Sequence, residues 1–433
     1  MRSEHEIINE TKFPKSRCTY AVTGFGILTP CGLGLDSILN AAADFDKGNG
    51  IERHKILNFN AGTLLSDRKV MKVVAHRDVL GLAAFETCLK NSGINKENIV
   101  PERTGMFVGA APSSILDNVN YNEAVDTLDI ENGIVDEERF GEVFASAAPT
   151  TLLNGLPNNV LCYGSKTIDA RGPNSNYTAM ETSSHLAVYG AVRSIKRGRN
   201  DCVIAGGYSS HLDQVFLGFL ERRGLGPRMV QNSQAPGEDR DFNGTDPAEG
   251  SAFMAIESPE HAKKRGANVL CQLVDVQIGN NVCGPFDSEA IEKNTSIEVL
   301  SALIVSTLTR NNLSFDQLGL ISLSSSGIES IDRLEQRAIV SLALGSKVDI
   351  SEIPNISISR LMGNLMEASG IVEIALMHHC YQKGSVPVAC LIPWPNSSSV
   401  DRQTIKSDRR YGLIVRTSMS GEHSCVLVDF NRG

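Results

Sequence analysis

The chain has no long uninterrupted hydrophobic run, and it therefore offers no candidate for a membrane-spanning helix, which needs about 20 apolar residues. Its first eighteen residues, MRSEHEIINETKFPKSRC, also lack the apolar core of a secretory signal. These two absences together predict a cytoplasmic protein that makes no membrane contact.

An excess of positive charge is also missing. The formal net charge is -9 and the isoelectric point is near 5.6, which argues against a broad nucleic-acid-binding surface. The ten cysteines are scattered, and no two of them form a CxxC pair or another metal-ligand spacing. We therefore expect small buried thiols and no metal site.

Strand-like and helix-like segments alternate along the 433 residues. Residues 18–30 predict a first strand because they are rich in apolar and β-branched side chains. Residues 76–93 carry apolar side chains at helical spacing and predict a helix that ends at Gly93, a natural C-cap. This alternation is typical of an α/β fold.

The second half of the chain repeats the pattern of the first. Residues 251–258 and 269–279 predict two paired strands, and the last two apolar runs predict closing strands with antiparallel pairing. Two similar halves indicate a duplicated unit. The predicted domains are residues 1–255 and 256–433.

A dinucleotide-binding fingerprint is suggested by VTGFGILTP but is incomplete. Gly24 and Gly26 match its first two glycines, whereas Thr29 replaces the third and Pro30 follows where a helix should begin. A tight turn from strand to helix explains the segment better, and we expect no dinucleotide cofactor.

The segment GPNSNYTAMETSSHLAVYGA carries the most chemical information. A strand-like piece enters a sharp turn at residues 178–180 and leaves as a helix, whose N-terminus points at the turn residue. A cysteine there would have a lowered pKa, but Met180 carries a thioether that is neither acid nor nucleophile. The hydroxyls of Ser183 and its neighbours would need a general base to react, with His185 as the candidate base. Helix capping by these serines and a structural role for His185 are the alternative interpretation.

Several segments, in this order, resemble the ketosynthase branch of the thiolase superfamily. VTGFGILTPCG resembles the family's VTGxGxxxPxG, GPNSNYTAMETSSHL resembles GPNxxxxTACATGAH, and DCVIAGG resembles DVMIAGG. GEDRDFNGTDPAEGSAFMAIESPEHAKKRGA matches a longer family motif with Asp239, Gly244, Glu249 and Gly250 in register. The resemblance implies a thiolase-like fold, in which duplicated αβαβα halves form a five-layered core.

The catalytic groups of that family are replaced at every matching position. The nucleophilic cysteine falls on Met180, and the first histidine falls on Ser324 of LSSSGIESIDRLE. The lysine and the second histidine of the motif KSxxGH fall on Ser359 and Asn364. The family's condensation needs a thiolate to hold the acyl chain and two imidazoles for decarboxylation and oxyanion stabilisation. The resemblance therefore implies an intact scaffold that is itself inactive.

The resemblance also implies a role in a complex. Ketosynthases are dimers whose acyl tunnels meet the dimer interface, so an inactive copy can pair with an active one and shape its tunnel. That is the chain length factor, or ketosynthase-β subunit, of bacterial type II polyketide synthases. Its partners are a catalytic ketosynthase subunit and an acyl carrier protein, whose phosphopantetheine arm reaches the catalytic subunit, so this chain needs no cofactor of its own.

Two features depart from the usual chain length factor. Such subunits usually carry glutamine where this chain has Met180, and a long insertion lies between about residues 120 and 157. We therefore expect a divergent branch, for example one that makes anthraquinones or aryl polyenes in Gram-negative bacteria.

In this family the residues that cap the growing chain follow the strand before the insertion. Matching GMFVGAAPSSI to that stretch places Val108, Ala111 and Ile115 on the tunnel wall. The small Ala111 would leave space where a bulky residue would stop the chain. Ordinary core packing is the alternative for Val108 and Ile115.

Two other functions remain open from the sequence. One is an autonomous acyltransferase or decarboxylase that uses a serine nucleophile, Ser183 or Ser324. The other is a scaffold subunit that only recruits the carrier protein. Basic residues from Arg193 to Arg199 are a candidate carrier-docking surface, or alternatively a solvated helix end.

Overall fold

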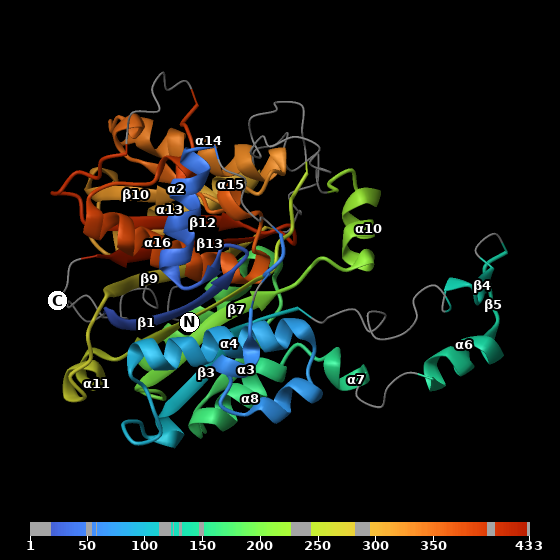
Figure 1. Cartoon of the computed structure of the whole chain (residues 1–433). Coiled ribbons are helices and arrows are strands. Elements are labelled where there is room, and N and C mark those ends of the chain that lie inside the picture. The colour runs from blue at the N-terminus through green and yellow to red at the C-terminus, as the bar shows by residue number, and fades with distance from the viewer. Residues whose placement is uncertain are drawn as a thin grey trace, which may run out of the picture.

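The computed structural model confirms the predicted α/β, thiolase-like fold (Figure 1). Helices cover both sides of one large mixed sheet whose strands come from the whole length of the chain. The structure describes residues 19–48, 54–57, 59–111, 123, 125–129, 132–146, 151–226, 244–281, 295–395 and 403–430.

Ten strands of the eleven-stranded sheet form two groups of five that meet at β1 and β9, and the short β2 pairs with β1. β1 pairs antiparallel with β8 along most of its length and with β9 at its first three residues. The first group is β6 (Asn174–Tyr177), β3 (Thr104–Gly109), β7 (Cys202–Ser209), β8 (Gly250–Glu257) and β1 (Tyr20–Thr29). The second is β9 (Cys271–Asn280), β13 (Glu422–Asp429), β12 (Tyr411–Thr417), β10 (Leu318–Ser322) and β11 (Asn355–Ile356).

One strand pairing differs from the prediction. Residues 251–258 and 269–279 do form strands, β8 and β9, but they do not pair with each other, because β1 lies between them. The predicted antiparallel pairing of the two closing strands is confirmed, since β12 and β13 form a hairpin. The division into residues 1–255 and 256–433 stays a prediction, and its boundary falls inside β8.

The helices form three layers around the two groups of strands. α4 (His76–Ser92) and α8 (Asn159–Ile168) cover the outer face of the first group, and α13 (Thr295–Arg310) and α14 (Glu329–Gly345) cover the outer face of the second. α9 (Ser183–Lys196) and α16 (Ser369–Lys383) lie between the two groups and belong to the same central apolar cluster. Alternate strand residues point to opposite faces, so Val203 and Ala205 face α9 while Ile204 faces α4. The expected five-layered core is confirmed.

The contact between β1 and α4 explains the glycine-rich start of the chain. A Cβ atom at Gly26 would lie 1.9 Å from the carbonyl oxygen of Ala84, so only glycine allows α4 to approach the strand. α4 ends at Gly93 with φ 71°, as the sequence predicted. The glycines of VTGFG therefore serve helix–strand packing.

No helix among the described residues is both long and apolar enough to cross a bilayer. The described cysteines carry free thiols, and all but Cys31 and Cys162 are buried. The remaining elements are β2 (Gly32–Leu33), α2 (Leu35–Asp46), α3 (Ala61–Leu64), η1 (Arg68–Lys72), η2 (Pro101–Arg103), β4 (Leu128–Asp129), β5 (Ile134–Val135), α6 (Glu137–Ala145), α7 (Thr151–Asn154), η4 (Met180–Thr182), α10 (Gln214–Arg222), α11 (Pro259–Lys264), η5 (Phe315–Gln317), η6 (Ile350–Glu352), α15 (Ser359–Met362), η7 (Met366–Ala368) and η8 (Val388–Cys390).

Candidate functional site

The predicted turn from strand to helix is present at Met180. β6 ends at Tyr177, Met180 has φ 47°, and η4 leads directly into α9. Positive φ is costly for a residue with a side chain, by about 1–2 kcal/mol, so the surrounding structure must enforce it. The turn is held by a hydrogen bond from the Thr178 hydroxyl to the Ala110 carbonyl (2.7 Å) and one from the Ala179 N–H to Ser183 Oγ (2.8 Å). We call residues 178–182 the first elbow.

The first elbow leaves Met180 half-buried at the N-terminal end of α9. A helix N-terminus favours a developing negative charge, as on a thiolate or an oxyanion. The Met180 thioether cannot be deprotonated, so the favourable field has no anion to stabilise. The architecture of a nucleophilic turn is present without its nucleophile.

A second elbow with the same backbone occurs at Met366, where φ is 46° and η7 leads into α16. Both elbows carry the pattern Met-Glu-x-Ser, at residues 180–183 and 366–369. The two turns pack against each other between the two groups of strands. This internal repeat is visible in the sequence, and it would have drawn attention to Glu181 and Glu367, which our motif analysis missed.

Glu181 fills the space next to Met180. Its side chain is fully buried and accepts hydrogen bonds from the Met419 backbone N–H (3.1 Å) and from Asn364 Nδ2 (3.4 Å). Burial raises the pKa of the Glu181 carboxyl, and these bonds only partly offset that effect. One carboxyl thus joins the first elbow, the loop at residue 364 and the loop at residue 419.

Asn364 lies where the family's second histidine was expected. Its Nδ2 also donates to Thr245 Oγ1 (3.1 Å), and its Oδ1 accepts from the Met366 backbone N–H (3.0 Å). Its own backbone N–H donates to the Asp246 carbonyl (2.6 Å). With both polar atoms occupied, the side chain acts as a connector of loops and has no titrating group to offer a substrate.

Ser324 and Ser359, at the expected positions of the first histidine and the lysine, contact each other. Ser359 Oγ donates to the Ser324 carbonyl oxygen (3.1 Å). The Ser324 N–H and hydroxyl donate to the two oxygens of Glu335 (2.8 and 2.7 Å), which also accepts from the Thr417 N–H. Burial raises the pKa of Glu335 to about 8. Both serines are buried within this network.

Three of the four matched positions, Ser324, Ser359 and Asn364, therefore lie along one buried polar network, and the half-buried Met180 precedes Glu181 of that network in the chain. It runs from Ser359 through Ser324 and Glu335 to Thr417, and two residues further on Met419 leads to Glu181 and Asn364. Each of these polar side chains has a partner within the chain.

Two further buried charge pairs flank the network. His211 Nε2 lies 3.0 Å from both oxygens of Glu367. Burial acts to lower the pKa of His211, but the Glu367 carboxylate outweighs burial and raises it. On the other side of α16, Arg416 and Glu373 form an ion pair in which both side chains are fully buried. The sequence patterns had not singled out these four residues.

The predicted tunnel residues lie at the end of β3. Val108 is fully buried in the cluster between the sheet and the layer of α4 and α8, as the packing alternative required. Ala111 is nearly buried, and its carbonyl oxygen accepts a hydrogen bond from Arg77. Ile115 lies outside the described residues. Their role in a tunnel stays a prediction.

The basic residues from Arg193 to Arg199 are exposed at the C-terminal end of α9. A helix rises 1.5 Å per residue, so this end lies about 20 Å from the first elbow at the N-terminal end. The segment is therefore on the far side of the layer from Met180, consistent with a solvated helix end.

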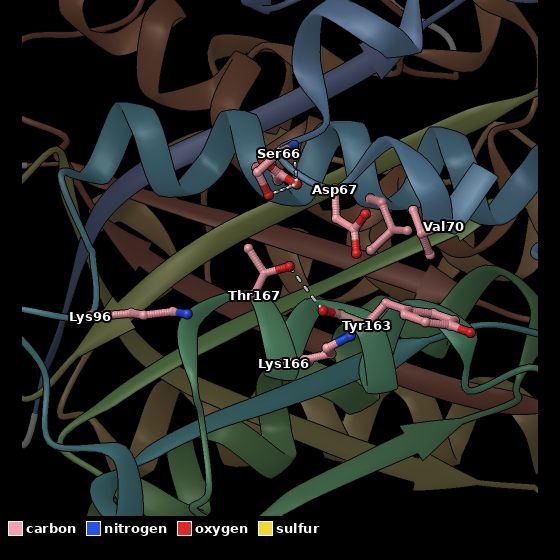
Figure 2. Close-up of a pocket in the computed structure, with 9 residues that line it drawn as sticks. Ser66, Asp67, Val70, Lys96, Tyr163, Lys166 and Thr167 are labelled. Carbon is pink, nitrogen blue, oxygen red and sulfur yellow. Dashed lines mark hydrogen bonds between the residues drawn. The ribbon is translucent and has the colours of Figure 1, made fainter. Parts of the chain in front are cut away.

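A hollow of about 230 Å³ lies on the outer helical layer between η1, α4 and α8 (Figure 2). Lys96 and Lys166 lie at it together with Asp67 and Glu86, so its charges balance. It is separated from the first elbow by the sheet and plays no part in the network above. Within the described ranges, no three His, Cys, Asp or Glu side chains gather so that they could hold a metal ion.

Comparison with known proteins agrees with this geometry. The family model "Beta-ketoacyl synthase, N-terminal domain" matches residues 36–262, which is more than half of the chain. The chain belongs to the β-ketoacyl synthase family.

Relatives of this chain cover most of its length at low identity. A mitochondrial 3-oxoacyl-[acyl-carrier-protein] synthase of Arabidopsis thaliana is 24% identical over 92% of this chain and 89% of its own. Among solved structures, the ishigamide ketosynthase/chain length factor gives a TM-score of 0.77 at 15% identity, covering 96% of this chain and all of that one. A type II polyketide synthase ketosynthase, solved bound to a hexaketide and in complex with its acyl carrier protein, gives 0.75 at 19% identity, with coverage of 96% and 100%. At these identities the structural likeness establishes the fold.

Proposed function

We propose that this chain is a non-catalytic chain length factor that pairs with a cysteine-bearing ketosynthase. The pair would elongate a poly-β-keto chain held on an acyl carrier protein, and this subunit would shape the tunnel that sets chain length. The observation that carries the proposal is the hydrogen-bond network at the first elbow. In it, the Glu181 carboxyl accepts hydrogen bonds from the Asn364 side chain and from the Met419 backbone N–H.

Chemistry at the first elbow argues for a partner role over an independent one. Decarboxylative condensation needs a nucleophile, a proton-transfer group and an oxyanion site in one open pocket. Here the turn residue is Met180, and Ser324, Ser359 and Asn364 lie buried in contacts with other protein groups. A chain that keeps the scaffold without the reactive groups can still serve as a binding partner, because the scaffold itself forms the surface that a second subunit contacts.

The structural relatives support the polyketide assignment. One of them carries the words ketosynthase/chain length factor in its description, and another is a ketosynthase described with its acyl carrier protein and a hexaketide. By analogy, the phosphopantetheine arm of a carrier protein would deliver the growing chain to the cysteine of the partner subunit. This chain would then contribute shape and would need no cofactor.

The edge strand β6 supports pairing with another subunit. β6 pairs with β3 on one side and is the last strand of the sheet within the described residues. An edge strand presents unpaired backbone groups that another chain can complete. The first elbow follows β6 directly, so a subunit that pairs there would lie beside Met180.

The alternative of a serine nucleophile has no support in the geometry. Ser183 Oγ accepts the Ala179 N–H as a helix-capping group, and Ser324 Oγ donates to Glu335. Both hydroxyls are fully buried, and each is engaged with a group of its own chain. His185, the candidate base, contacts Ser424, and burial lowers its pKa to about 3.

Co-expression with a cysteine-bearing ketosynthase of the source organism tests the proposal. A stable 1:1 complex is expected, and polyketide formation by purified components should require both subunits and the carrier protein. A soluble homodimer of this chain that binds no such ketosynthase would overturn the proposal. Covalent acylation of this chain alone by an acyl carrier protein thioester, detected by intact mass, would favour the serine alternative.

Chain-length control has its own test at Ala111. The change Ala111→Phe in the complex should shorten the product, because the larger side chain would fill tunnel space. Val305→Phe, on the exposed outer face of α13, is a matched control that should leave product length unchanged. Products of unchanged length from both variants would remove Ala111 from the tunnel wall.

A further inference from the structure

Part of the insertion after β3 forms a small structure of its own outside the layered body. In Figure 1, the hairpin of β4 and β5 and the helix α6 lie apart from the sheet and its helices. We call the described residues 123, 125–129 and 132–146 the arm.

The arm is held together by its own hydrogen bonds. β4 and β5 pair antiparallel, and the Asp136 N–H donates to the Thr127 carbonyl (2.8 Å). Asp136 then caps α6, because its Oδ1 accepts the Arg139 N–H (3.1 Å). On α6 the rings of Phe140 and Phe144 are 4.6 Å apart. These contacts define a specific local fold.

Both ends of the insertion are clamped to the body by one buried residue. Arg77 on α4 donates from Nη1 to the Ala111 carbonyl and from Nη2 to the Leu156 carbonyl (3.1 Å). Next to this clamp, the Ala110 N–H donates to the Tyr177 carbonyl at the end of β6 (2.9 Å). The arm therefore starts at the edge strand, beside the first elbow.

Exposed apolar side chains gather in and next to the arm. Six of the thirteen large hydrophobic residues that are exposed in the described structure lie between residues 128 and 156. The exposed fraction of Ile134 is 61%. Contiguous exposed apolar surface marks a protein contact, because leaving it in water forfeits the free energy of burial. The six are Leu128, Ile134, Val135, Phe144, Leu153 and Leu156.

The charge of the arm selects among possible partners. Its described residues include seven acidic side chains and one basic side chain, Arg139, and all eight are exposed. A second copy of this chain, with net charge -9, would be repelled on average. An exposed surface that carries both apolar and acidic side chains fits a different subunit that presents apolar and basic groups.

We infer that the arm binds the subunit that pairs at β6. The apolar side chains of the arm contact that subunit, and the acidic side chains of the arm face a basic surface on it. The occupant is the catalytic ketosynthase, so this inference rests on the proposed function. Its physical basis is that the clamp at Arg77 and the end of β6 share one edge of the molecule. A subunit added at that edge lies within reach of the arm.

The affinity of the purified heterodimer tests the apolar contact. The triple change Leu128→Ser, Ile134→Ser and Val135→Ser should weaken binding of the co-expressed cysteine-bearing ketosynthase at least tenfold. The unbound triple variant should melt at the wild-type temperature, because these side chains are exposed. Val305→Ser with Leu344→Ser removes exposed apolar groups from the outer layer of α13 and α14 and should bind like wild type.

Two measurements test the acidic side chains of the arm and the position of the arm in the complex. Glu137→Gln, Glu138→Gln and Glu142→Gln together should weaken binding at low salt and flatten its salt dependence. A photoreactive benzoylphenylalanine in place of Phe144 should cross-link to the ketosynthase in the intact complex.

The possible outcomes separate this inference from the proposed function. If wild type forms no complex with the ketosynthase, both fail. If the complex forms but the arm variants bind as tightly as wild type, only the role of the arm is overturned. Cross-linking from position 144 to the chain's own body, or to a second copy of the chain, would overturn it in the same way.

Discussion

The first elbow, at Met180, and the second elbow, at Met366, share a backbone turn but differ in their surroundings. Met180 is half-buried beside the edge strand β6, whereas Met366 is fully buried with Leu220, Ile331 and Met419. Each is followed by a buried glutamate, Glu181 or Glu367. The same four-residue pattern thus serves one turn near the surface and one turn in the core.

This difference shows what each elbow contributes. The carboxyl of Glu181 takes hydrogen bonds from neutral groups of two loops, so it joins the first elbow to both loops. Glu367 is paired with the imidazole of His211, so it stabilises the contact between η7 and the loop after β7. The first elbow is therefore partly accessible at Met180, whereas the second is buried in the core.

The largest loss of stability is expected in the helix that follows the second elbow. Glu373 of α16 lies seven residues after Met366, and the residue seven positions after Met180, in α9, is Ala187. Glu373→Leu would leave Arg416 as a buried charge without its ion-pair partner, and should destabilise the protein by about 3–5 kcal/mol. Urea denaturation measures the loss. Adding Arg416→Met should recover most of it, and a single variant as stable as wild type would show that the pair is dispensable.

Truncating the two methionines tests the contrast in burial directly. Met366→Ala should cost about 2–5 kcal/mol because it leaves a cavity in a packed cluster. Met180→Ala should cost less than about 1 kcal/mol because the side chain is partly in water. Equal losses in urea denaturation would contradict the different environments of the two elbows.

Cysteine substitution measures access to each elbow. With Cys162→Ser as the background, the thiol of Met180→Cys should react with iodoacetamide in the native state. The thiol of Met366→Cys should react more than about tenfold more slowly, because it becomes accessible only when the structure opens. Peptide mass spectrometry follows both sites. Restoring this cysteine alone should not restore condensation, since both histidine positions remain occupied by Ser324 and Asn364.

The smallest effect is a difference in pH dependence. The folded-state pKa of Glu181 is raised, so the folded protein keeps a proton that the unfolded chain releases above about pH 4.5, and stability falls as the pH rises from there. The pKa of His211 is also raised, so its contribution is complete below about pH 6.5 and is lost at higher pH.

Stability measured across the pH range separates the two groups. Glu181→Gln should flatten the slope from about pH 4.5 upward, by at most about 1.4 kcal/mol per pH unit for one proton. His211→Gln should flatten it only above about pH 6.5. If both variants change the same pH range, the two elbows do not titrate independently.

Much of the fold could be predicted from local patterns. The helix at residues 76–93 and the closing hairpin follow from apolar spacing and from a C-capping glycine, which act over a few residues. The pairing of β8 with β9 was wrong because a strand's neighbour is chosen by long-range packing, and β1 from the start of the chain occupies that place.

The site was predictable in outline only. The sequence placed Met180 correctly at a turn from strand to helix, whereas the contact between Ser324 and Ser359 was found only in the structure. The partners of Glu181, such as Asn364 and Met419, are 183 and 238 residues away in the chain, and no local pattern indicates such a contact.

By itself, the sequence determined that the turn residue carries no reactive group, because residue identity decides whether a side chain can act as nucleophile or base, and a thioether at Met180 can do neither. It also determined the alternation of helices and strands, because side-chain periodicity sets which face is apolar. Only the tertiary structure decided that Glu181 joins the loops at residues 364 and 419 and that Arg77 holds both ends of the insertion near β6. Such contacts depend on where distant segments meet once the apolar layers pack, and burial then determines which polar groups must find partners.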